Sequence, residues 1–113
     1  MEAKQIVAGI NKAMIERNAK DIEVIEVSNA TLLADYFIIC SGTSSTHIKA
    51  IADEIEFEME KEGVTARKEG MNTAKWVLMD YGSVIAHVFF EEDREYYRLD
   101  RLWSGELPVN RPE

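Results

Sequence analysis

Cysteine, proline and long hydrophobic runs are scarce in this sequence of 113 residues. The single cysteine, Cys40, excludes an internal disulfide, and the apolar run 36–40 that contains it predicts a buried thiol. No stretch approaches the roughly 18 consecutive apolar residues of a membrane span, and the first residues lack the pattern of a signal peptide. These absences predict a protein of a reducing compartment, and the lack of a transit segment favours the bacterial cytoplasm.

Positive charge is also scarce, since 13 Lys and Arg residues stand against 21 Asp and Glu residues, for a formal net charge of −8. A field of this sign repels phosphate backbones, which disfavours direct, sequence-specific binding of nucleic acid. The basic residues Arg17, Lys20, Arg67 and Lys68 are too scattered to predict a patch that overrides it. The charge instead favours a basic protein as partner, and many basic proteins coat RNA.

The apolar residues that are present, 46% of the chain, follow helical and strand patterns. Together these patterns predict a single α+β domain, with a mixed β-sheet of about five strands and helices packed on it. Helices are predicted for 2–18, for the segment between the turn at 41–46 and Gly63, and for 92–103, and strands for 21–27, 35–40, 64–69, 76–79 and 84–90.

Three of these strand predictions are detailed enough to be tested. In 21–27, Ile22, Val24 and Val27 nearly alternate with acidic residues, which predicts a strand with one wet face. Within 35–40, the five successive apolar or aromatic residues 36–40 predict a central strand covered on both faces. The runs 76–79 and 84–90 flank a turn that contains glycine, which predicts a hairpin.

Residues that could hold a metal or carry out catalysis do not form a recognisable motif. His47, His87 and Cys40 are far apart in sequence and form no H-x-x-x-H or C-x-x-C motif, so we expect no metal and no cofactor. Cys40 and His87 would form a nucleophile and base only if neighbouring strands brought them within hydrogen-bond reach. No strand carries a D-x-D pair for two-metal phosphoryl chemistry, and Asp80 stands alone at a turn. This absence argues against an enzyme.

Two features keep alternative interpretations open. The turn from Ser41 to Thr46 precedes a helix, so its backbone N–H groups could hold a phosphate, although an ordinary strand-to-helix turn needs the same residues. His87 is interpreted either as a hydrogen-bonded, half-buried strand residue or as a polar point on a binding face.

Large aromatic residues concentrate in the last third of the chain, where they exceed what a small core usually needs. Because Trp, Tyr and Arg dominate interface energetics, this concentration predicts a recognition surface. Phe57 points away from the apolar stripe of its predicted helix, amid a mostly acidic face, and marks a possible contact patch or dimer seam. The aromatic residues of the last third include Trp76, Tyr81, Phe89, Tyr96, Tyr97 and Trp103.

Three segments in order resemble the ribosomal silencing factor (Iojap) family: 34–44 (ADYFIICSGTS), 76–82 (WVLMDYG) and 94–103 (REYYRLDRLW). The likeness covers most of the chain, from the first helix to Trp103. It implies a single domain over 1–103, related to nucleotidyltransferases but without their catalytic motif. The tail 104–113 matches no motif and, with two prolines, is expected to be flexible.

The resemblance also implies a function without catalysis. Members of the family bind the large ribosomal subunit through the basic ribosomal protein uL14, block joining of the small subunit, and repress translation under nutrient limitation. Carried over to this sequence, the contact residues are Trp76, Leu78, Asp80 and Tyr81, followed by His87, Arg94, Tyr97 and Trp103. The alternatives are a nucleotide-binding or nucleotidyltransferase-related enzyme that uses the turn at 41–46 with Asp80, and a homodimer closed by Phe57 and the aromatic hairpin.

Overall fold

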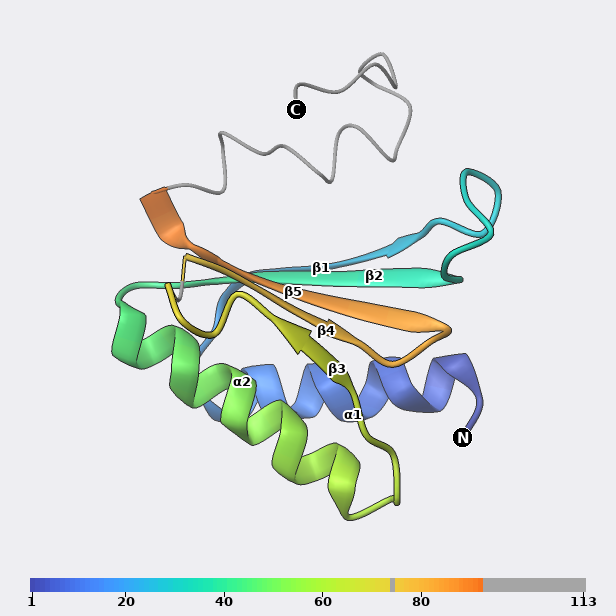
Figure 1. The fold of residues 1–113 in the computed structure, drawn as a ribbon, viewed down its shortest axis with the longest axis horizontal. Helices are drawn as coiled ribbons and strands as arrows, with labels where there is room; N and C mark the ends of the chain where they lie inside the picture. The colour runs from blue at the N-terminus through green and yellow to red at the C-terminus, as the bar shows by residue number, and fades with distance from the viewer. Residues whose placement is uncertain (74, 93–113) are drawn as a thin grey trace.

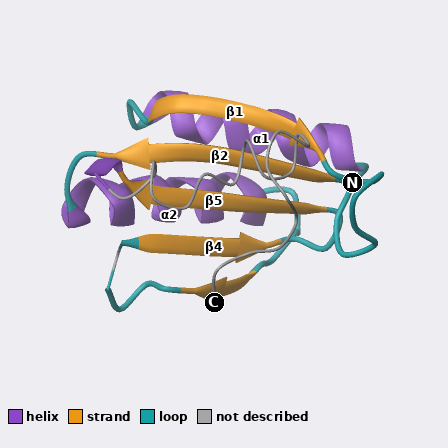
Figure 2. Cartoon of the chain, turned by 90° about the horizontal axis from the view of Figure 1, so that it is seen from above, coloured by secondary structure: helices purple, strands orange, loops and turns teal. Residues whose placement is uncertain are grey.

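The computed structural model describes residues 1–73 and 75–92, in which two helices cover one face of a five-stranded sheet (Figure 1). The strand order is β1-β2-β5-β4-β3, visible from above in Figure 2. β2 and β5 are parallel and the other pairs are antiparallel, so the sheet is mixed, as predicted. The elements are α1 (Ala3–Glu16), β1 (Lys20–Glu26), β2 (Tyr36–Gly42), α2 (Ser45–Glu60), β3 (Arg67–Glu69), β4 (Trp76–Asp80) and β5 (Val84–Phe90).

Both helices begin with hydrogen bonds that the local sequence supplies. The backbone N–H of Glu2 donates to Oε1 of Gln5 at 2.9 Å, and the N–H of His47 donates to Oγ of Ser44 at 3.1 Å. These bonds satisfy backbone or side-chain groups at the helix starts that would otherwise depend on water. Within the described residues, no helix is long and apolar enough to cross a membrane.

The main core lies between the helices and the sheet. The apolar faces of α1 and α2 pack on alternate residues of the central strands, because side chains of a strand point to opposite faces in turn. This helix-covered core contains Ile6, Ile10, Met14, Ile48, Ile51, Ile55, Met59, Ile38, Cys40, Val77, Met79, Val84, Ala86 and Val88.

The prediction of a central strand and of a hairpin is confirmed. β2 lies between β1 and β5, and six of its seven residues are buried. β4 and β5 pair antiparallel around a turn in which Gly82 has a φ of +86°. A glycine adopts this left-handed conformation without a steric penalty, which explains its position in the turn.

The strand predicted for residues 21–27 is confirmed, but the prediction that only one of its faces is wet is wrong. β1 is an edge strand with no buried residue, and Val24 is 48% exposed. A bulge between Lys20 and Glu23, with Asp21 at a φ of +53°, interrupts the alternation. Edge position and bulge together leave both faces of β1 partly exposed.

The edge strand predicted at 64–69 is shorter than expected, because β3 covers only Arg67–Glu69. Its side chains are exposed, and Lys68 Nζ lies 2.8 Å from Oε2 of Glu56 on α2. The predicted helix 92–103 falls outside the described residues except for its first position, and the predicted tail 104–113 falls outside them entirely. The relation to nucleotidyltransferases stays a prediction.

Candidate functional site

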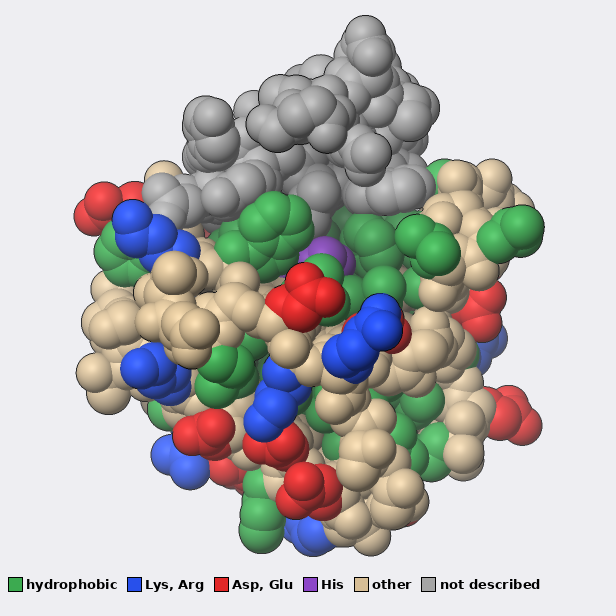
Figure 3. Space-filling view, in the orientation of Figure 1, with side chains coloured by type: hydrophobic (Ala, Val, Ile, Leu, Met, Phe, Trp, Pro, Cys, Tyr) green, Lys and Arg blue, Asp and Glu red, His purple; other side chains and the backbone are tan. Residues whose placement is uncertain are grey.

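The predicted contact residues on β4 and β5 meet on the face of the sheet opposite the two helices. Trp76 and Leu78 are half-buried and pack against a second apolar cluster on this face. In Figure 3 hydrophobic side chains gather along this side of the molecule, with a histidine among them. This cluster is built from Val27, Ala34, Phe37, Ile39, Ile85 and Phe89.

Strand register brings Trp76 and His87 together. Trp76 pairs with Phe89 and Leu78 pairs with His87, so the Trp76 indole lies diagonally across from the imidazole. The indole Nε1–H donates to Nδ1 of His87 at 3.1 Å. The Trp76 ring also stacks on Phe89 at 5.0 Å between centroids, and these two contacts hold its orientation.

His87 is a buried, uncharged residue at the centre of this face. It is 3% exposed, and the Phe37 ring lies 4.6 Å from its imidazole. Burial lowers the pKa of His87 from its ordinary value of 6.5 to about 4, so the ring is neutral at pH 7. Since Nδ1 accepts from Trp76, the proton lies on Nε2, which has no hydrogen-bond partner in the described part of the chain.

Asp80 takes part in the structure of the hairpin. Its Oδ1 accepts the backbone N–H of Gly82 at 2.8 Å, and its Oδ2 lies 3.8 Å from Nη2 of Arg67 on β3. The carboxylate therefore fixes the β4–β5 turn and faces a cation on the neighbouring strand.

Tyr81 is separated from the other predicted contact residues. It is 8% exposed and belongs to the core under the helices, on the side of the sheet opposite Trp76. Burial, together with the nearby carboxylates of Glu56 and Glu60, raises the pKa of Tyr81 to about 12. Arg94, Tyr97 and Trp103 lie outside the described residues.

Neighbouring strands do not bring Cys40 and His87 within hydrogen-bond reach, so the condition for a nucleophile and base is not met. In the parallel register of β2 and β5, Ile39 pairs with His87 and Cys40 pairs with Val88. Cys40 therefore faces the helix-covered core, whereas His87 faces the opposite side of the sheet. The two side chains cannot exchange a proton through the sheet.

Two groups of the turn from Ser41 to Thr46 are engaged by His47. The N–H of Thr43 donates to Nδ1 of His47 at 2.9 Å, and Oγ of Ser44 accepts the N–H of His47. Nε2 of His47 lies 2.7 Å from the carbonyl oxygen of Arg17, which fixes the ring between two segments. These bonds are those of a structural connection between β2 and α2.

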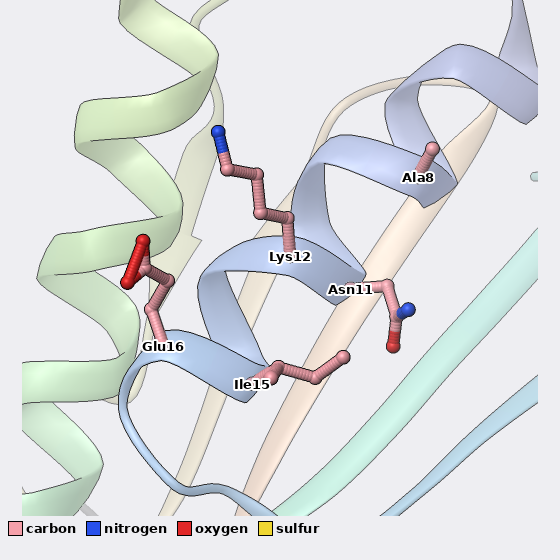
Figure 4. Close-up of a pocket in the computed structure, with 5 residues that line it drawn as sticks. All are labelled: Ala8, Asn11, Lys12, Ile15 and Glu16. Carbon is pink, nitrogen blue, oxygen red and sulfur yellow. The ribbon is translucent and has the colours of Figure 1, made fainter.

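A shallow hollow lies along the outer side of α1 (Figure 4). All five residues that line it come from this one helix, and Lys12 and Glu16 extend toward α2. The hollow is lined by Ala8, Asn11, Lys12, Ile15 and Glu16.

Three carboxylates near this helix lie close enough together to be considered as metal ligands. The carboxylates of Glu16, Glu54 and Glu58 lie within 4.8 Å of one another. Arg17 pairs with Glu54 at 3.0 Å, however, and Lys12 and Lys61 flank Glu58.

Sequence reasoning missed two parts of this surface. The rings of Phe37 and Phe89 contact the ring of His87. The sequence predicted Phe37 only as part of a strand and Phe89 only as one of the clustered aromatic residues. The connection between β1 and β2 lies in no predicted helix or strand, and in it Leu32 is 102% exposed and Leu33 is 80% exposed. Two adjacent leucines after the polar stretch 28–31 were the available signal. Phe57 is 57% exposed, as predicted, with Nζ of Lys61 4.9 Å from its ring centre.

The chain is similar to proteins that share one family description. The family described as "Ribosomal silencing factor during starvation" matches residues 1–113. Ribosomal silencing factor RsfS of Bacillus subtilis is 39% identical over 110 residues, which cover 96% of this chain and 92% of that protein. RsfS of Haemophilus influenzae is 40% identical over 85 residues, covering 74% of this chain and 83% of that protein. A crystal structure of a Chromobacterium violaceum protein superposes with a TM-score of 0.90 at 32% identity, covering 96% of this chain and 91% of that chain.

Proposed function

Because this chain belongs to the ribosomal silencing factor family, we propose that it binds the large ribosomal subunit through the basic ribosomal protein uL14. Bound there, it blocks association with the small subunit and represses translation in the cytoplasm under nutrient limitation. This mechanism is steric exclusion, which needs affinity and bulk but no reactive group.

The observation that carries the proposal is the anchored aromatic on the face of the sheet opposite α1 and α2. Trp76 is half-buried, and its indole is fixed by the bond to His87 and by the stack on Phe89. Leu78 lies on the same face, two residues along β4. A preoriented Trp with an apolar neighbour is typical of the few residues that dominate an interface, because little entropy is lost on binding.

Charge supports a basic protein as the partner. The chain has a formal net charge of −8, so it repels the RNA around a ribosomal protein but attracts the protein itself. Approach is then guided toward basic protein surface, and the apolar residues supply the contact.

The residues considered for chemistry have structural partners, which supports a role without catalysis. Asp80 accepts from the Gly82 backbone and faces Arg67, and Cys40 lies on the opposite face from His87. The Thr43 N–H, a candidate phosphate donor, is bonded to His47.

The test is sedimentation of the purified protein with separated large and small bacterial ribosomal subunits. The variant is Trp76→Ala/Leu78→Ala, because truncation of the core residue Tyr81 would disturb folding as well as binding. The matched control is Phe57→Ala, which removes an exposed aromatic from α2 on the helix side. Far-ultraviolet circular dichroism and the melting midpoint establish that each variant is folded.

We expect the wild type and Phe57→Ala to sediment with the large subunit, and the double variant to remain in the supernatant. Addition of small subunits to the bound complex should then yield fewer joined ribosomes than without the protein. Retention of a folded Trp76→Ala/Leu78→Ala variant would place the contact elsewhere, and absence of wild-type binding would refute the ribosomal role.

A further inference from the structure

The loop between β1 and β2 displays two leucines to solvent. The side chains of Leu32 and Leu33 are 102% and 80% exposed, which is unusual for adjacent large apolar residues. We propose that they form a second apolar anchor for the basic protein that is proposed to bind Trp76 and Leu78. The inference therefore rests on that proposed function and extends its contact surface.

The backbone of this loop is held by hydrogen bonds. The Val27 N–H donates to the carbonyl of Asp35 at 2.8 Å, which closes the loop at its base. The N–H groups of Ala30 and Thr31 donate to the carbonyl of Val27 at 2.9 and 3.0 Å, and the Leu33 N–H donates to Oγ1 of Thr31 at 3.1 Å. The leucines are thus presented by an ordered turn, so that binding them costs little additional ordering of the chain.

The loop continues the surface that contains Trp76. Val27 lies at the start of the loop, and Ala34 follows the two leucines. Both are buried in the apolar cluster against which Trp76 and Leu78 pack. Figure 1 shows the β1–β2 loop rising above the sheet on the side opposite α1 and α2. A partner seated on the Trp76 face therefore meets the loop without a change in the fold.

The charge of the residues around the loop indicates which class of partner it can bind. The segment from Asp21 to Ile48 contains no Lys or Arg, whereas Glu26 and Asp35 stand on either side of the loop. RNA phosphates and anionic lipid are repelled by such a segment. Exposed leucines between carboxylates fit an apolar pocket on a protein, rimmed by Lys or Arg.

The test measures the affinity of the full chain for large ribosomal subunits, with Leu32→Ser/Leu33→Ser as the variant. The matched control is Ile15→Ser, which places the same polar group at a 60% exposed apolar position on α1. A second control, Leu32→Met/Leu33→Met, keeps the loop apolar. Because the two leucines are exposed, the melting midpoint of all variants should stay close to that of the wild type.

We expect the serine variant to bind at least roughly tenfold more weakly, and both controls to bind like the wild type. Equal binding by the serine variant, with loss of binding in Trp76→Ala/Leu78→Ala, would overturn this inference and leave the proposed function standing. If instead the wild type forms dimers that the serine variant does not, a second copy occupies the loop and the inference is overturned. Absence of wild-type binding to either subunit would refute the proposed function, and this inference with it.

Discussion

The indole Nε1–H of Trp76 on β4 donates to Nδ1 of His87 on the adjacent strand β5 at 3.1 Å. This bond determines both the orientation of the indole and the tautomer of the imidazole. The residue proposed to contact the partner is thus oriented by a neighbour that is 3% exposed.

The stability of the protein should depend on pH through His87. Its pKa is lowered from 6.5 to about 4 in the folded state, so the unfolded chain binds a proton more readily than the native protein. The contribution of the neutral ring to the free energy of unfolding is fully present above pH 6.5, and it is lost as the pH falls from 6.5 toward 4. We expect the free energy of unfolding to fall by about 2 kcal/mol between pH 7 and pH 5 from this group.

Denaturant unfolding at both pH values checks this dependence, with His87→Gln as the comparison because glutamine does not titrate. The carboxylates contribute equally in both proteins, so the difference between them isolates the histidine. The same pH dependence in both would show that His87 is not the titrating group.

The bond between Trp76 and His87 should be measurable as a coupling energy. Trp76→Phe keeps an aromatic ring but leaves the buried Nδ1 without its donor, which we expect to lower the free energy of unfolding by about 1–3 kcal/mol. A double-mutant cycle with His87→Phe measures the pair, for which we expect a coupling of about 1 kcal/mol. Additive effects of the two substitutions would contradict a bond that contributes to stability.

The glycine before β4 should tolerate no side chain. Gly70 has a φ of +87°, and a Cβ atom there would lie 2.0 Å from the carbonyl oxygen of Trp76. We expect Gly70→Ala to lower the free energy of unfolding by at least about 3 kcal/mol, because the backbone of β4 would have to move.

Gly63→Ala is the matched control for this substitution. Gly63 has a φ of +77°, but a Cβ atom there would meet nothing within 4 Å, so that only backbone strain of about 1–2 kcal/mol is expected. Thermal or denaturant unfolding compares the two, and equal losses would show that contact with Trp76 is unimportant.

Nucleotide and Mg²⁺ should leave the melting midpoint unchanged. The Asp80 carboxylate is engaged by Gly82 and Arg67, and the Thr43 N–H donates to His47, so a phosphate or metal would have to displace internal bonds. A ligand that binds only the folded state must raise the midpoint. A rise with millimolar ATP and Mg²⁺ that depends on Asp80 would establish the nucleotide-binding alternative instead.

Binding to the large subunit should weaken as ionic strength rises. The net charge of −8 is proposed to guide the chain to a basic protein, and salt screens such attraction over a distance of about 8–10 Å at physiological ionic strength. Association rates measured between 50 and 300 mM salt check this, whereas the apolar contacts should keep the dissociation rate nearly constant. An association rate that rises with salt would point to repulsion between the charged surfaces.

The sequence by itself determined most of the helices and strands. The spacing of Ile6, Ile10 and Met14 is that of one helix face, and α1 follows it. The unbroken apolar run of 36–40 lies in the buried strand β2, as expected for a strand covered on both sides. These features could be predicted because helix and strand periodicities depend on residues close together in the chain.

Only the tertiary structure decided which of these residues meet. The parallel register of β2 and β5 separates Cys40 from His87, and the antiparallel register of β4 and β5 brings Trp76 to His87. Tyr81, predicted as a contact residue together with Trp76, lies in the core, while Leu32 and Leu33, which no predicted helix or strand contains, are exposed. Strand order and register depend on hydrogen bonds and packing between segments far apart in the chain, which local patterns do not encode.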